Sequence, residues 1–285
     1  MPNMHSTRRI HAKGAFARLH AYFQARSPKY CAGLFAVLLA VVLLAAPSPY
    51  CIETPGPTQD VLGKAESGEV ISIEGAETYA DDGKLLLTTV NASGVPGYPV
   101  SNIVALIGWF DPHSVVMPRE AVVPIGQTAE EYSAESQEEM SSSQGDAADA
   151  ALAFMASRGM GADGVEVSMH VDDIGGPSAG MMYALGVIDK LTPQDETGGL
   201  TIAGTGTIDA DGTVGAIGGI RLKMLGARRD GATWFLAPEE NCAEVVGHVP
   251  DGLRDVSVST LEEAYEALVA IGKGEGDALP HCSAA

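Results

Sequence analysis

The stretch VDDIGGPSAGMMYALG, residues 171–186, decides how the chain folds around one turn. The residues before it, GVEVSMHV (164–171), alternate apolar with other side chains, which predicts a half-buried strand. The residues after it, AGMMYALGVIDKL (179–191), place apolar side chains at helical spacing. Ser178 therefore lies where a strand turns into a helix, and the positive end of that helix favours the stabilisation of an oxyanion.

The chain around this turn predicts one continuous α/β unit in which mixed sheets pack against helices. An acidic, serine-rich stretch (126–145) is expected to be a solvated helix face or a loop, and Asp209 and Asp211 are expected in a hairpin turn and not in a calcium site. Strands are expected over 69–75, 84–90, 164–171, 232–238 and 253–259 and in a pair within 198–219, and helices over 100–110, 146–161, 179–191, 220–231, 240–249 and 260–272.

Charge and hydropathy separate the N-terminal part from the rest. The first 29 residues contain six of the 17 Lys and Arg residues and no Asp or Glu, and an uncharged segment, YCAGLFAVLLAVVLLAAPSPYC (30–51), follows. The remaining chain contains all 37 acidic residues, so its surface repels nucleic acid. The segment is expected to be a single-pass membrane anchor, and the positive-inside rule then places the N-terminus in the cytoplasm and the rest of the chain on the extracytoplasmic side.

Two questions stay open, one about the apolar segment and one about two cysteines far from it. A cleaved signal peptide is the alternative to an anchor, because LLAAPS (43–48) offers small residues for cleavage. Cys242 and Cys282 lie in the acidic part, where an oxidising compartment permits a disulfide, but the sequence does not pair them.

Ser178 fits two nucleophilic chemistries. GPSAG (176–180) matches the nucleophile elbow of α/β-hydrolases, whose esterase chemistry needs a downstream histidine, here His248 or His281. Alternatively, a lysine activates the serine if burial keeps its amine neutral. Lys223 lies on the apolar face of the predicted helix 220–231, although its stem could also extend to solvent.

GGPSAG (175–180), followed by TIDADGTVGAIGGIRLKMLGARRDGATWFLAPEEN (207–241), resembles the proteolytic domain of Lon proteases, the Ser-Lys peptidase family. The resemblance extends from about Gly68 to Ile271. It implies that Ser178 is the nucleophile, that Lys223 is the general base, and that Thr197 helps to orient the amine. Backbone groups around the serine, at Gly176, Pro177 and Ala179, are expected to stabilise the oxyanion.

The chain also departs from that family. It contains no G-x-x-x-x-G-K-[ST] motif, which predicts the absence of the ATPase, and no PDZ domain fits between Gly161 and the serine strand. The expected organisation is a basic cytoplasmic tail (1–29), a transmembrane anchor (30–50), a linker (51–67), a Lon-like proteolytic domain (68–273) and a flexible tail (274–285).

These features together predict an ATP-independent serine endopeptidase that cleaves unfolded, membrane or secreted polypeptide segments. No cofactor or metal is expected, and a hexameric ring follows only from analogy with the family. The alternative class is a non-catalytic, membrane-anchored module with a Lon-like fold that binds peptides or assembles without hydrolysing them.

Overall fold

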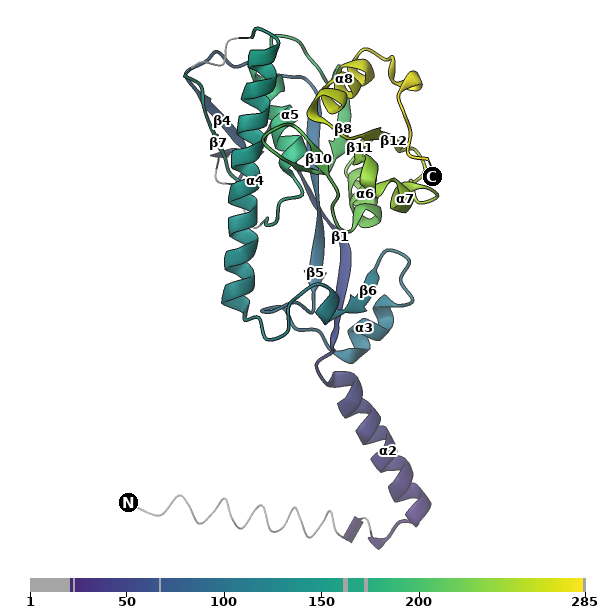
Figure 1. Ribbon diagram of the computed structural model, residues 1–285. Helices are drawn as coiled ribbons and strands as arrows, with labels where there is room; N and C mark the ends of the chain where they lie inside the picture. Colours follow the sequence, from purple (N-terminus) through teal and green to yellow (C-terminus); the bar gives the residue numbers. More distant parts are fainter. Residues whose placement is uncertain (1–20, 23, 67, 161–163, 172–173, 284–285) are drawn as a thin grey trace, which may run out of the picture.

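The protein is described by a computed structural model that covers residues 21–22, 24–66, 68–160, 164–171 and 174–283. Its domain is organised by one six-stranded sheet in the order β12-β11-β8-β5-β1-β6 (Figure 1). Four neighbouring strands are parallel, and the last two are antiparallel to their neighbours. The strands are β1 (Tyr50–Asp60), β5 (Lys84–Ser93), β6 (Val115–Pro118), β8 (Thr201–Gly204), β11 (Trp234–Pro238) and β12 (Arg254–Val258).

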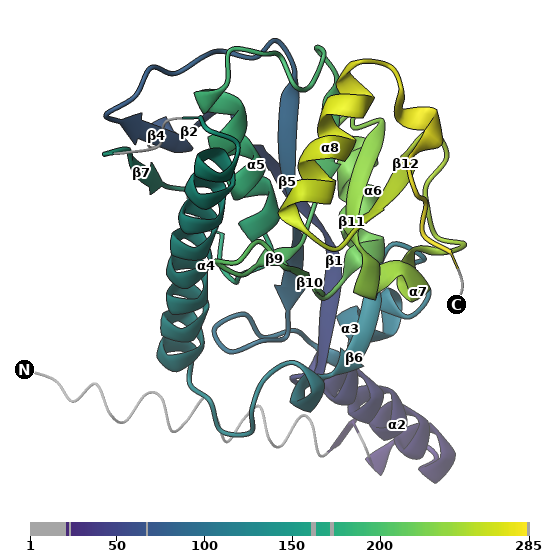
Figure 2. The same ribbon diagram turned by 45° about the horizontal axis from the view of Figure 1, so that its top comes forward.

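The two faces of this sheet bury two separate cores, as the alternation of side chains along β5 shows. Leu85 and Leu87 pack with α4, α5 and α8, whereas Leu86 packs with α6 and α7 on the other face. Figure 2 shows α5 and α8 over the sheet with α4 beside α5. These helices span Ala129–Ser157 (α4), Gly180–Leu191 (α5), Ile220–Arg229 (α6), Cys242–Val245 (α7) and Leu261–Gly272 (α8).

Helix α5 is the centre of the larger core. Every residue from Gly180 to Leu191 except Lys190 is buried, which suits a helix that is apolar on all sides. Because Ser178 lies two residues before the first residue of this helix, a buried helix holds the serine turn.

Small sheets and short helices complete the described chain. The hairpin β9–β10 confirms the turn predicted at Asp209 and Asp211, since Gly212 donates its backbone N–H to the Asp209 carbonyl at 2.8 Å. The small strands pair as β2 (Lys64–Ala65) with β3 (Gly68–Glu69), β4 (Ile71–Glu74) with β7 (Glu166–Met169), and β9 (Thr207–Ile208) with β10 (Val214–Gly215). The short helices are α3 (Asn102–Gly108), η1 (Arg119–Ala121), η2 (Glu239–Asn241) and η3 (Gly276–Ala278).

The predicted linker 51–67 is instead largely strand β1, which pairs with both β5 and β6. Pro55 and Pro57 suggested a loop, because proline cannot donate to a ladder. The ladder accommodates them through a register shift between Pro55 and Thr58. The folded domain therefore begins with β1, a few residues after helix α2 ends.

Helix α4 begins well before the predicted start at Asp146. Thr128 caps it, and the Thr128 side chain and Glu131 form a reciprocal capping box. The acidic, serine-rich stretch is thus the first half of a 29-residue helix, in keeping with the solvated-face interpretation.

The apolar segment forms helix α2, Pro28–Ala45, with none of its residues buried. Its mean hydropathy of 2.0 over 18 residues is sufficient to cross a membrane, and a signal sequence near the N-terminus would meet the same criteria. The helix ends at Ala45, and β1 begins at Tyr50, inside the predicted anchor boundary.

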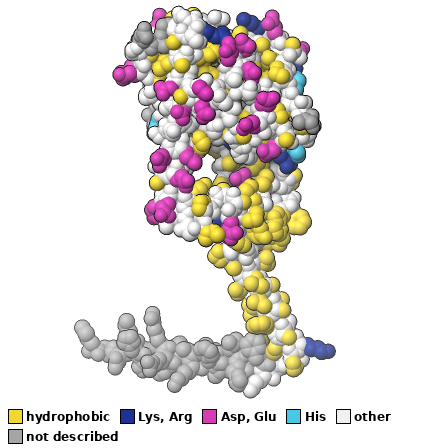
Figure 3. All heavy atoms as spheres, in the orientation of Figure 1, with side chains coloured by type: hydrophobic (Ala, Val, Ile, Leu, Met, Phe, Trp, Pro, Cys, Tyr) yellow, Lys and Arg dark blue, Asp and Glu magenta, His cyan; other side chains and the backbone are white. Residues whose placement is uncertain are grey.

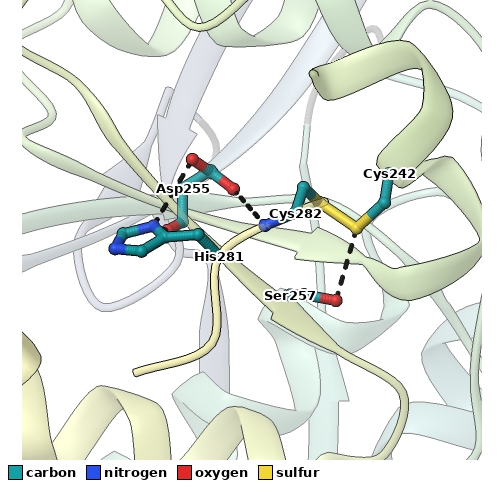
Figure 4. The surroundings of a disulfide bond; sticks show 5 residues. All are labelled: Cys242, Asp255, Ser257, His281 and Cys282. Carbon is teal, nitrogen blue, oxygen red and sulfur yellow. Dashed lines mark hydrogen bonds and ion pairs between the residues drawn. A yellow bond between two sulfur atoms is a disulfide. The ribbon is translucent and has the colours of Figure 1, made fainter. Parts of the chain in front are cut away.

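The C-terminal segment predicted to be flexible is tied to β12. A disulfide joins Cys242 to Cys282, and the Cys282 backbone N–H donates to the Asp255 carboxylate at 2.7 Å (Figure 4). Ser257 also donates its backbone N–H to the Pro280 carbonyl at 2.9 Å. Residues up to Cys282 therefore belong to the folded domain.

Candidate active site

Backbone contacts fix the conformation of the turn that contains Ser178. Gly206, directly after β8, donates its N–H to the Ser178 carbonyl at 2.9 Å, and the Ser143 hydroxyl of α4 donates to the Pro177 carbonyl at 2.9 Å. Gly176 has a φ of +83°, a conformation that favours glycine over residues with a side chain. The half-buried Ser178 is therefore held between α4 and the end of β8.

Lys223 lies in the first turn of α6 and is only 2% exposed. The helix begins after Gly219, which has a φ of +70°. A side chain at this position would collide with Val90, which lies 2.8 Å from where a Cβ atom would be. Burial lowers the pKa of Lys223 to about 8, and the nearby Glu53 carboxylate opposes this shift. The neutral amine is consequently a minor form near physiological pH, but far more populated than for a lysine in water.

Thr205 connects the lysine to the serine turn. The Lys223 ammonium donates to the Thr205 hydroxyl at 3.0 Å, and that hydroxyl donates to the Ser178 carbonyl at 3.0 Å. Thr205 is fully buried, so no bulk water competes for these bonds. The structure thus brings Ser178 and Lys223 to one site, through a residue that the sequence analysis did not identify.

Thr197, expected to orient the amine, contacts a different group of residues. Its hydroxyl lies 2.6 Å from the Asp81 carboxylate and 3.0 Å from the Asp195 carboxylate. Asp81 lies beside Asp189, about 14 Å along α5 from the serine end of that helix. The threonine that contacts Lys223 is Thr205.

The three predicted oxyanion residues differ in what their backbones can donate. The Gly176 N–H already donates to the Ser136 carbonyl at 3.0 Å, and Pro177 has no N–H. Ala179, the N-cap of α5, has a backbone N–H at the positive end of the helix. Of the three, Ala179 is therefore the candidate donor.

Glu53 of β1 is a further site residue that the sequence analysis missed. Its carboxylate lies 3.4 Å from the position that a Cβ at Gly219 would occupy, at the start of the lysine helix. Burial raises the pKa of Glu53, and the charge of Lys223 counteracts this. The sequence offered no signal, because Glu53 lies in the stretch interpreted as a linker.

A cleft of about 1360 Å³ opens beside the serine turn. Polar side chains of α4 form one wall, among them Ser136, Gln137 and Gln144, and the segment ending at Gly175 forms another. Gly175, at the edge of this cleft, is three residues before Ser178 in the chain.

One group of described residues could hold a metal ion. Oxygen atoms of Asp81, Asp189 and Glu196 lie within 4.8 Å of one another, and carboxylates are ligands for hard cations. Burial, followed by the neighbouring Asp81 carboxyl, raises the pKa of Asp189 to about 9. A proton on Asp189 therefore relieves part of the repulsion in this cluster at neutral pH.

The two downstream histidines lie in other surroundings. His281 Nδ1 is 2.6 Å from the Asp255 carbonyl, next to the disulfide (Figure 4). His248 is exposed and follows α7, on the α6 face of the sheet. The side chain that reaches the serine turn is that of Lys223, through Thr205.

The sequence around this site is similar to that of known proteins. Residues 161–271 match the Lon protease (S16) C-terminal proteolytic domain. Lon protease 2 of Herpetosiphon aurantiacus is 36% identical over 135 residues, which is 43% of this chain and 16% of that protein. Lon protease of Clostridioides difficile is 39% identical over 95 residues, 32% of this chain and 12% of that protein.

Lon protease 2 of Bacillus subtilis is 30% identical over 119 residues, 39% of this chain and 21% of that protein. The chain therefore spans less than a quarter of each of these three relatives. Ser178, Thr205 and Lys223 all lie within the matched range. Residues 161–271 belong to the Lon (S16) family of proteolytic domains.

Proposed function

We propose that this chain is a serine endopeptidase in which Ser178 is the nucleophile and Lys223 the general base. The supporting observation is the buried path from the Lys223 amine through the Thr205 hydroxyl to the Ser178 backbone. A lysine can act as a base only when neutral, and the pKa of about 8 makes this form accessible.

The reaction would proceed by acyl transfer. The neutral Lys223 amine takes the Ser178 proton, and Oγ forms a bond with the scissile carbonyl carbon. The Ala179 N–H stabilises the resulting oxyanion. As the C–N bond breaks, Lys223 returns the proton to the leaving amine, and it then activates the water that hydrolyses the ester.

Thr205 takes the orienting role that the resemblance implied for Thr197. Its hydroxyl accepts from the amine and donates to the Ser178 carbonyl, so it sets the position of both groups at once. This is a positioning role, because Thr205 acts through its two neighbours.

The substrate would be a polypeptide in an extended conformation. The sequence contains no Walker motif for ATP-driven unfolding, and the cleft that includes Gly175 offers polar side chains of α4 beside apolar ones such as Met140 and Ile174, a mixture that suits a polypeptide. Assembly into a ring of identical copies is an expectation from the family.

The site would lie outside the cytoplasm, on a domain held to the membrane by α2. The basic N-terminal segment, the apolar helix and the disulfide support this location together.

The test is cleavage of casein by the full chain in detergent without ATP. Ser178→Ala should reduce the rate by about a thousandfold or more, whereas Ser168→Ala, an exposed serine on β7, should leave it unchanged. Thr205→Val should reduce the rate by about ten- to a hundredfold, and Thr205→Ser should restore most of it. Undiminished cleavage by the Ser178 variant would end the proposal, and casein binding without cleavage by the unmodified chain would favour the peptide-binding module.

A further inference from the structure

An apolar surface lies at the base of the domain, on α3 and the two residues that follow it. Helix α3 has no charged residue, and its apolar side chains are exposed although it belongs to a folded domain. Phe110 is 83% exposed, Ile107 61% and Trp109 57%. We call this surface the α3 patch, and its members are Ile103, Val104, Leu106, Ile107, Trp109 and Phe110.

The α3 patch is joined to the end of helix α2. Asn102 donates its side-chain amide to the Leu43 carbonyl at 2.8 Å and its backbone N–H to the Ala46 carbonyl at 3.0 Å. The Tyr50 and Trp109 rings meet edge to face at 5.3 Å. In Figure 3, apolar side chains gather where α2 meets the domain, while acidic side chains are spread over much of the remaining surface in view.

These contacts provide hydrogen-bond donors for carbonyl groups at the C-terminal end of α2. The last carbonyls of a helix have no partner within the helix, and lipid offers none. Asn102 supplies donors to two of them. The start of α3 is therefore held at the level where α2 leaves its apolar environment.

We propose that the α3 patch lies in the interface of the bilayer into which α2 inserts, as a second membrane contact of the domain. The continuity of the patch with α2 argues for lipid as its partner, since α2 is unburied and is long and apolar enough to span a bilayer. An exposed tryptophan beside aliphatic residues is typical of the boundary between headgroups and acyl chains. Attraction to anionic headgroups does not contribute, because the chain beyond residue 29 is strongly acidic.

This second contact would hold the catalytic site close to the membrane. Glu53, beside the lysine helix, is three residues after Tyr50, or about 10 Å along an extended strand. With α2 alone, the domain could tilt about the short connection at residues 46–49. With the α3 patch also in contact, the site would face polypeptide segments next to the bilayer, a consequence that rests on the proposed peptidase function.

The chain contains two tryptophans, which makes the test direct. Trp109 is in the α3 patch, and Trp234 is 8% exposed in the domain. The full chain is reconstituted into phosphatidylcholine vesicles whose acyl chains are brominated near the headgroup. Trp234→Phe leaves Trp109 as the only tryptophan. Its fluorescence should lose more than half of the intensity that it has in vesicles without bromine, and its emission maximum should lie at shorter wavelength than that of an indole exposed to water.

Trp109→Phe is the matched control, in which Trp234 should not be quenched. In the Trp234→Phe background, Ile107→Ser with Phe110→Ser should reduce quenching at least twofold, whereas Val246→Ser, an exposed apolar residue after α7, should not. If the chain stays in the vesicles during a carbonate wash and Trp109 is not quenched, the proposal is overturned. Extraction of the chain by carbonate would also overturn it, because α2 would then not be inserted. Casein cleavage by the same vesicles reports the peptidase function separately.

Discussion

The proposed chemistry depends on the buried amine of Lys223 and on the electrostatic influence of the nearby Glu53 carboxylate. The amine is buried to 2% exposure, and burial alone would drive its pKa far down. The Glu53 carboxylate moves the pKa of the amine upward and so keeps part of the charge. The base strength of the site is therefore a balance between desolvation and one carboxylate on a neighbouring strand.

The balance predicts a specific pH profile. A general base must be deprotonated, so kcat/KM for a fluorogenic peptide should rise with pH through about 8 and level off above it. Glu53→Gln removes the negative charge that raises the pKa of Lys223, so the rising limb should move to lower pH. Glu74→Gln, an exposed glutamate on β4, is the control and should leave the limb in place. A limb that does not move in Glu53→Gln would show that the profile reports a different group, and Lys223→Arg should have no activity at any pH.

Helix α5 links two polar sites through one apolar element. Its N-terminal end follows Ser178, and near its C-terminal end Asp189 is 2% exposed beside Asp81 and Glu196. Asp189 Oδ2 and Glu196 Oε2 have no partner among the described residues. The helix is thus anchored at one end by the serine turn and at the other by carboxyl groups that must share protons or a cation.

Asp189 predicts how stability depends on pH. Its folded pKa of about 9 is far above its unfolded value, so folding takes up a proton and is favoured at low pH. The stability of the unmodified chain should therefore fall as pH rises from about 5 to 9. Asp189→Asn imitates the protonated form, so its melting temperature should exceed that of the unmodified chain by an increasing margin over this range. Asp251→Asn, an exposed control, should show a constant difference, and a constant difference for Asp189→Asn would contradict the prediction.

The elements that the sequence predicted well are those with a strong hydrophobic period. The strand and helix around Ser178, the hairpin at Asp209 and the lysine helix all follow from side-chain spacing within one segment. Strand β1 was missed because its prolines break the local pattern, and pairing with β5 and β6 determines its conformation.

Pairing between distant strands also determines which of the two threonines, Thr197 or Thr205, contacts Lys223. Thr197 and Thr205 each precede a glycine, so the local sequence does not distinguish them. Only the parallel pairing of β8 with β5 and β11 places Thr205 at the strand end that meets α6. Contacts between segments distant in the sequence therefore determine both the conformation of β1 and which threonine contacts Lys223.

At the scale of the whole molecule, the domain is fastened at both of its chain ends. At the start, β1 leaves α2 and enters the sheet directly. At the end, the segment after α8 returns to β12, where Arg254 pairs with Asp277 at 2.6 Å and the disulfide closes the connection. The exposed ion pair contributes little by itself, so the disulfide is the main constraint on this segment.

The disulfide predicts a redox-dependent stability. It closes a loop with a sequence separation of 40 residues, for which the chain-entropy relation gives about 4 kcal/mol of stabilisation. Cys282→Ser should therefore lower the free energy of unfolding by about 2–4 kcal/mol in urea titrations of the full chain in detergent. Dithiothreitol should destabilise the unmodified chain by a similar amount and leave the variant unchanged.

Because Cys242 of α7 and Cys282 of the C-terminal segment lie against the edge strand β12, away from Ser178, the variant should retain casein cleavage at temperatures well below its melting point. An unmodified chain that is insensitive to the reductant, with no free-thiol change on unfolding, would show that the two cysteines are not joined in the protein.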